Sequence, residues 1–97
     1  MGNILAATTS GGTSSEFTVS DPVHVHVFPN NGLEFVGIVE KKNSDGSFSA
    51  FKAEPEPGAQ PIAVDLNQAR SSRLITAPGT YRVVKSPTVA AIGVDTD

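Results

Sequence analysis

Short runs of the chain alternate between apolar and polar residues, the pattern of strands that bury one face. The clearest run spans residues 23–28, Val-His-Val-His-Val-Phe, in which three valines fall on one face and two histidines on the other. No segment has the helical apolar period of about 3.6 residues. The pattern predicts an all-β fold, a small antiparallel β-sandwich or barrel with about eight short strands. These strands are expected at residues 16–19, 23–28, 33–41, 47–52, 62–66, 74–76, 80–85 and 89–94.

Turn-forming residues separate the expected strands. Residues 43–46, Asn-Ser-Asp-Gly, predict the best hairpin of the chain, between the third and fourth strands. Residues 29–32, Pro-Asn-Asn-Gly, predict another tight turn. Three prolines exclude residues 54–61 from a central strand and indicate an exposed loop, because proline has no N–H for the ladder. Residues 67–72 are the one candidate for a helical turn, with an asparagine as its cap.

The N-terminal residues 1–15 differ in composition from the remainder. Residues 6–15 are small, mostly polar and uncharged, which predicts a flexible arm ahead of a single domain at 16–97. Ile4 and Leu5 are the sizeable apolar side chains of this arm, and we expect them to anchor it on a partner. A frayed terminus without function is the alternative interpretation.

Composition restricts the possible partners and compartments. The chain has 97 residues, a net charge of −3 and no cysteine. No block of basic residues is present, so neither nucleic acid nor an anionic membrane is an expected partner. The first residues lack the basic and apolar regions of a signal peptide. Without disulfides, a domain this small is expected either to fold in a reducing cytoplasm or to gain stability by assembly.

The two histidines are the strongest candidates for chemistry. His24 and His26 share one face of a strand, so both imidazoles can reach one metal ion. The chain has no third histidine, and the first glutamate beyond the pair is Glu34, on the far side of the 29–32 turn. We therefore expect an exposed polar face without a metal, and keep a small metal-dependent barrel enzyme as an alternative.

No other residues form a recognisable catalytic arrangement. The acidic residues are scattered, and no serine lies in a Gly-x-Ser-x-Gly sequence. Arg70 and Arg73 flank two serines and are expected to form surface ion pairs. The sequence thus predicts no catalytic residue and no cofactor.

One short segment resembles a known corner. Ala77-Pro78-Gly79-Thr80-Tyr81 is similar to the E–F corner of immunoglobulin-like domains at its glycine and tyrosine. It differs in having Ala77 in place of aspartate and Val83 in place of cysteine. The resemblance implies a half-buried Tyr81 whose hydroxyl bonds to a backbone group a few residues upstream.

The chain also resembles the small β-rich virion proteins of tailed bacteriophages. The resemblance rests on the length, the lack of cysteine, the Ala/Thr/Ser-rich start, the segment 77–83 and the closing Gly93-Val94-Asp95. It implies a non-enzymatic decoration or cement protein of the capsid exterior, a dimer or trimer made in the host cytoplasm, whose partner is the major capsid protein or another virion protein. On this hypothesis, deleting residues 2–15 abolishes capsid binding and leaves the fold intact. The alternative is an adhesion or carbohydrate-binding module.

Overall fold

The computed structural model describes residues 2–28, 36–53, 56–67, 71–88 and 91–96, and this part of the chain consists of strands and connections without a helix. The expectation of an all-β fold is confirmed, although the described residues already form twelve strands in place of about eight. The strands are β1 (Gly2–Thr8), β2 (Gly12–Thr13), β3 (Phe17–Val19), β4 (Val23–Phe28), β5 (Val36–Lys42), β6 (Phe48–Ala50), β7 (Lys52–Ala53), β8 (Ile62–Ala63), β9 (Asp65–Asn67), β10 (Ser72–Ile75), β11 (Gly79–Lys85) and β12 (Ile92–Thr96).

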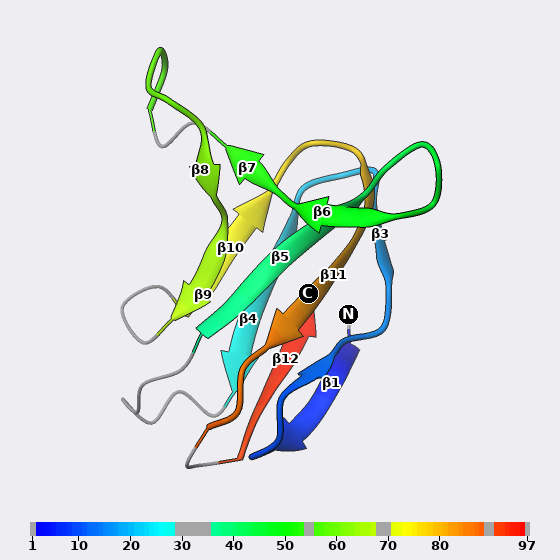
Figure 1. Cartoon of the computed structure of the whole chain (residues 1–97), viewed down its shortest axis with the longest axis vertical. Helices are drawn as coiled ribbons and strands as arrows, with labels where there is room; N and C mark the ends of the chain where they lie inside the picture. The colour runs from blue at the N-terminus through cyan, green and yellow to red at the C-terminus, as the bar shows by residue number, and fades with distance from the viewer. Residues whose placement is uncertain (1, 29–35, 54–55, 68–70, 89–90, 97) are drawn as a thin grey trace.

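Two antiparallel sheets form the body of the molecule (Figure 1). The first sheet has the order β1-β12-β4-β10. The second has β11 and β5 at its centre, with β2 and β3 along one side of β11 and β6 and β9 along the other side of β5. Strands β7 and β8 pair only with each other and form a hairpin that extends away from both sheets (Figure 1).

The core lies between the facing sides of these two sheets. The alternation predicted for 23–28 is confirmed, since Val23, Val25 and Val27 are buried while His24 is exposed. The buried apolar side chains come from both sheets and from the connections between their strands, which is the arrangement of a sandwich. They are Val19, Val23, Val25, Val27, Val39, Val64, Leu66, Ile75, Tyr81, Val83, Ile92 and Val94.

The predicted hairpin at 43–46 is confirmed. β5 pairs with β6, and Gly46 closes the turn with a φ of +92°, a backbone that glycine adopts without strain. The Asp45 carboxylate accepts hydrogen bonds from the Ser47 hydroxyl (2.6 Å) and the Ser47 N–H (2.9 Å). Both hydrogen bonds lower the pKa of Asp45, and the bond from the Ser47 hydroxyl has the larger effect.

The other two predicted turns fall wholly or partly outside the described residues. The turn predicted at 29–32 lies outside them, and the described strands before and after it, β4 and β5, belong to different sheets. Of the helical turn expected at 67–72, Asn67 is the last residue of β9 and Ser72 the first of β10, and residues 68–70 lie outside the described part.

The tyrosine corner forms at the start of β11. The Tyr81 hydroxyl donates a hydrogen bond to the carbonyl oxygen of Ala77 at 2.7 Å, as the resemblance implied. Gly79 has a φ of +153°, a backbone conformation that other residues rarely adopt, so this position favours glycine; a Cβ there would also displace the end of the Lys41 side chain. Tyr81 is 0% exposed, and the expectation of half burial was wrong, because the rings of Phe17 and Phe51 cover it.

The N-terminal segment is part of the sandwich, so the expected flexible arm at 1–15 is corrected. β1 pairs with β12 at the edge of the first sheet, and β2 pairs with β11 in the second. Ser14 is buried and holds Val83 through two hydrogen bonds of 2.8 Å, one from its N–H and one to its hydroxyl. Deleting residues 2–15 would remove an edge of each sheet, so the fold is not expected to survive that deletion.

β1 lies very close to β12. A Cβ on Gly93 would lie 2.6 Å from the Leu5 carbonyl oxygen, 2.8 Å from the Ala7 nitrogen and 2.7 Å from the Phe28 ring. The tight packing expected of the closing strand is therefore confirmed at Gly93, whereas Ala91 is exposed.

Candidate functional site

The β7–β8 hairpin is an excursion from the edge of the second sheet. β5 pairs with β6 through residues 40–42 and with β9 through residues 36–38, so β6 and β9 follow one another along the same edge. Between them the chain leaves the sheet at Phe51 and returns at Val64. Most of the hairpin was predicted as the exposed loop at 54–61. Within the described part, residues 56–58, 60 and 61 are exposed, as expected, and Ala59 is half-buried.

Three backbone hydrogen bonds close the root of the hairpin. The Val39 N–H donates to the Val64 carbonyl (3.0 Å), the Val64 N–H to the Phe51 carbonyl (2.8 Å), and the Phe51 N–H to the Val39 carbonyl (2.9 Å). Val39 and Val64 are buried, so this cycle of bonds lies largely away from water. The two points where the chain leaves and rejoins the sheet are thereby fixed to the same residue of β5.

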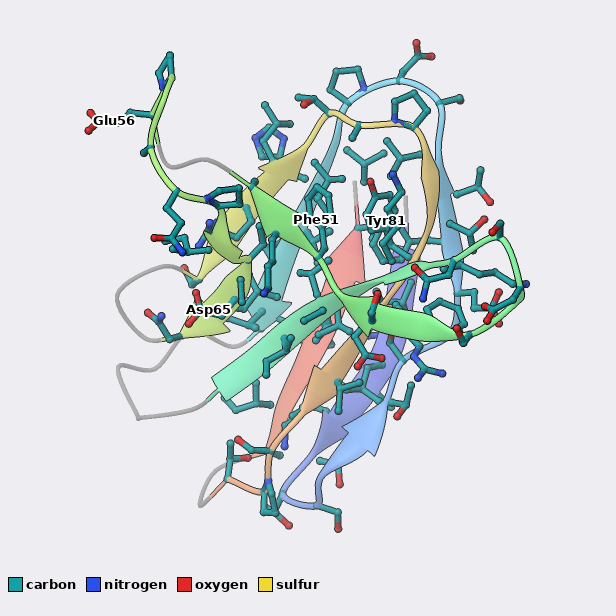
Figure 2. All side chains as sticks on the ribbon, turned by 45° about the horizontal axis from the view of Figure 1, so that its top comes forward. Phe51, Glu56, Asp65 and Tyr81 are labelled. Carbon is teal, nitrogen blue, oxygen red and sulfur yellow. The ribbon has the colours of Figure 1, made fainter. Side chains whose placement is uncertain are left out.

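Aromatic packing also fixes the root. The Phe51 ring meets the Tyr81 ring edge to face, with centroids 5.2 Å apart and planes at 81°. Phe17 stacks on Tyr81 at 5.9 Å. Such pairs contribute about 0.5–1.5 kcal/mol beyond the area that they bury. Figure 2 shows Phe51 and Tyr81 together over the core, while Glu56 lies far out on the hairpin.

The outer part of the hairpin is exposed. Gly58 has a φ of +85°, and the Ala59 N–H donates to the Glu56 carbonyl at 3.1 Å, so the described tip is a tight turn. Ile62 on β8 is 48% exposed, although its spacing from Val64 and Leu66 places it in the apolar register of the run 62–66. Ile62 is exposed because, at this residue, the chain lies in the hairpin and not in the sheet. The result is an apolar side chain on a projecting element with a fixed root.

Ile4 and Leu5 were expected to anchor an arm on a partner, but the structure places them against their own domain. Both are half-buried and pack against the core of their own chain. The Ile4 carbonyl also accepts a hydrogen bond from the Ser15 N–H at 2.8 Å. The apolar surface of these two residues therefore contributes to the sandwich itself, and the projecting apolar residue is Ile62.

The two histidines lie on the outer face of the first sheet. Cross-strand register places Asn3, Asp95, His26 and Ser72 in one row across all four strands. Asp95 accepts a hydrogen bond from the Asn3 amide at 3.0 Å, and its other carboxylate oxygen lies 3.8 Å from the His26 Nε2. His24 lies opposite Leu74 on β10. In the part of the chain that the structure describes, no three His, Cys, Asp or Glu side chains form a group able to hold a metal ion.

Two arginines pair with carboxylates of the second sheet: Arg82 from within that sheet, and Arg73 from β10 of the first sheet. The Arg82 Nε donates to the Glu40 carboxylate at 2.7 Å, and its guanidinium lies 4.0 Å from the centroid of the Phe48 ring. Arg73 donates to the Asp65 carbonyl at 3.0 Å and lies 3.5 Å from its carboxylate. The ion pair expected for Arg73 is confirmed, and Arg70 lies outside the described residues.

A buried lysine was missed by sequence reasoning. Lys85 is 4% exposed, and its ammonium donates to the carbonyl oxygens of Ser10 (3.0 Å) and Ser86 (3.2 Å) and to the Thr88 hydroxyl (3.0 Å). All three donors of the ammonium are used, which ties the β1–β2 connection to the segment after β11. Burial lowers the pKa of Lys85. The signal was present in the sequence, because Lys85 continues the inward alternation of Tyr81 and Val83.

Comparisons of the chain with protein-family models, with curated proteins and with solved structures found no match. Within the described residues there is no helix long and apolar enough to span a membrane. The candidate site is therefore defined by geometry alone, as the rigidly rooted and exposed β7–β8 hairpin.

Proposed function

We propose that the protein is a non-enzymatic structural protein of a bacteriophage virion, which binds the capsid exterior as a decoration or cement protein. Its partner on this proposal is the major capsid protein or another virion protein, and its location is the assembled virion. The resemblance to small virion proteins supports this class of function. The structural observation that carries the proposal is the β7–β8 hairpin, which holds Ile62 away from the body of the domain.

The construction of the hairpin suits docking on a protein lattice. Its root is fixed by the bonds among Val39, Phe51 and Val64, so little conformational freedom is lost there on binding. A decoration protein gains avidity from many equivalent weak contacts, and each copy then needs only a small contact element. One exposed isoleucine, next to the tight turn of residues 56–59, is an element of this size.

Substitution of the exposed isoleucine tests the proposal. Ile62→Lys places a charge at the projected contact, while the partial exposure of Ile62 leaves the sandwich unaffected. Ile38→Lys is the matched control, because Ile38 is also exposed, at 37%, but lies on the outer face of the second sheet. Co-sedimentation with shells of the major capsid protein of the same phage measures binding. We expect Ile62→Lys to weaken it about ten-fold or more, the loss typical of a contact hot spot, and Ile38→Lys to leave it unchanged.

Equal binding by all three proteins, or no binding of the unmodified protein to the shells, contradicts the proposal. Two further measurements address the alternatives from the sequence. Stoichiometric zinc, iron or manganese in the purified protein would favour an enzyme that uses His24 and His26. Specific binding on a glycan array would favour a carbohydrate-binding module.

A further inference from the structure

β10 forms an edge of the first sheet. Its neighbour is β4, and no strand of the described residues pairs with its other side. The Val27 N–H donates to the Ser71 carbonyl at 2.9 Å, which makes these two residues a hydrogen-bonded pair. Because such pairs alternate along an antiparallel ladder, Arg73 and Ile75 also bond to β4. The N–H and C=O groups of Ser72 and Leu74 then point away from β4, toward the open edge of the sheet.

This edge lacks two of the features that protect edge strands, a β-bulge and a proline. β1, at the opposite edge of the same sheet, has irregular register between Asn3 and Leu5 and again between Leu5 and Thr8. β10 pairs in continuous register, contains no proline, and turns its one charged side chain, Arg73, toward Asp65. Its Leu74 is 52% exposed, more than any other large apolar side chain described. A regular edge that exposes a leucine, and whose one charged side chain is paired within its own chain, is a template for another strand.

We propose that this edge binds a second copy of the chain, with β10 antiparallel to β10 about a two-fold axis and Leu74 opposite Leu74 of the second copy. Each Leu74 then donates to and accepts from its counterpart through the backbone groups that point outward. The first sheets of the two copies become one continuous sheet. Because each copy uses its β10 edge in this pairing, no β10 edge remains to bind a third copy.

Charge selects this register. If the axis passed through Arg73, the outward groups of Ser72 and Leu74 would also pair, but two guanidinium groups would lie directly opposite each other. Like charges in that position destabilise a pair of strands, whereas apolar pairs contribute about 0.2–1 kcal/mol each. With Leu74 at the axis, Ser72 lies opposite Thr76 of the second copy, and Arg73 lies opposite Ile75. The register with Leu74 at the axis therefore opposes no like charges along β10.

The same strand is favoured over a foreign strand because β10 is complementary to itself. The outward-facing residues Ser72 and Leu74 are uncharged, so they give no preference for a strand of opposite charge. A small disulfide-free domain also gains stability from pairing with a second copy. This inference does not depend on what the β7–β8 hairpin binds.

Leu74→Lys tests the pairing. It places two ammonium groups opposite each other at the axis, and its side chain lies on the exposed face, so the unfolding temperature of the monomer is expected to stay unchanged. Sedimentation equilibrium up to about 1 mM, the weak limit of specific affinities, measures the dissociation constant. We expect a dimer whose dissociation constant rises about ten-fold or more in Leu74→Lys. Ile62→Lys and Ile38→Lys are the matched controls and should dimerise like the unmodified protein.

Hydrogen exchange of the backbone amides identifies the interface. The N–H groups of Leu74 and Ser72 should become protected as the concentration rises, and should lose this protection in Leu74→Lys. A protein that remains monomeric throughout the concentration range overturns the proposal. So does a dimer that Leu74→Lys leaves intact, or one in which the Leu74 amide exchanges freely. Loss of capsid binding in Ile62→Lys with dimerisation intact separates this inference from the proposed function.

Discussion

Replacing Tyr81 by phenylalanine removes a single hydrogen bond from the centre of the fold. The ring and its contacts with Phe17 and Phe51 remain, while the bond of 2.7 Å to the Ala77 carbonyl is lost. Leaving a partly buried acceptor without its donor costs about 1–3 kcal/mol. In a domain of 60–100 residues, each kcal/mol lowers the midpoint of thermal unfolding by about 4–8 °C. We therefore expect Tyr81→Phe to be folded at neutral pH but clearly less stable.

The Tyr81 hydroxyl also makes the stability of the protein decrease at alkaline pH. Burial raises the pKa of Tyr81 above the usual tyrosine value of 10.0. The unfolded chain thus releases the phenolic proton at lower pH than the folded chain, and stability present below pH 10 is lost as the pH rises toward the folded pKa. For one proton the slope is at most about 1.4 kcal/mol per pH unit. Tyr81→Phe lacks this decline, so the difference between the two proteins narrows above pH 10.

The chain contains one tyrosine, so two measurements isolate the effect. Tyrosinate absorbance during a pH titration of the folded protein reports Tyr81 alone, and its midpoint is expected above 10. Urea unfolding from about pH 8 to about pH 11 then compares the unmodified protein with Tyr81→Phe across the range in which tyrosine titrates. Ile92→Val is the control, because it removes a buried methyl group from the first sheet and leaves the rings around Tyr81 in place, so it should lower stability without changing the pH profile. Equal stability of Tyr81→Phe and the unmodified protein at about pH 8, or an identical alkaline decline, would refute the role given to this bond.

Two further substitutions, at Lys85 and at Gly93, test how the N-terminal segment packs against the rest of the sandwich. Lys85→Met should lower the free energy of unfolding at pH 7 by about 1–3 kcal/mol, because buried acceptors lose their donor. The pKa of Lys85 is lowered by burial, so the advantage of the unmodified protein should grow as the pH rises toward 10.5, and a constant difference would argue against a buried ammonium. Gly93→Ala should cost about 1–3 kcal/mol in urea unfolding, since its Cβ meets the backbone of Leu5 and Ala7. Gly12→Ala is its control, with only the Leu5 side chain within 4 Å, and equal losses in both would contradict the close approach of β1.

The parts of the fold that the sequence predicts are those set by local chemistry. The alternation of 23–28, the turn at Gly46 and the corner at Tyr81 each depend on residues that are close in the chain, and all three are confirmed. The N-terminal strand was missed because bulges break its alternation and because Ile4 and Leu5 are adjacent rather than two residues apart. Local patterns carry no signal for a strand whose partner, β12, lies at the other end of the chain.

The candidate site was predicted only in part for a similar reason. The prolines identify 54–61 as exposed, but they do not show that the chain leaves and rejoins one strand at one residue. That geometry depends on Val39, which bonds to both Phe51 and Val64 although they lie 13 residues apart in the chain. Pairing across such a separation is set by the whole sheet, and a single sequence records the alternation of each strand without its partner.

The side chains that are paired within the chain, and the apolar groups that are exposed, indicate what kind of partner the surface suits. Arg82 and Arg73 bind Glu40 and Asp65, and His26 lies beside Asp95, so much of the charge on the two sheet faces is already engaged within the chain. The large apolar side chains exposed on the described surface are Ile62 of the hairpin, Leu74 of β10 and Ile38 on the outer face of the second sheet, and β10 also has outward backbone groups. Apolar side chains and strand edges recognise protein surfaces and other strands, whereas small polar substrates require converging polar groups. On the two proposals made above, these surfaces have separate tasks: the edge of β10 would pair with the β10 edge of a second copy, and the hairpin would contact a different protein.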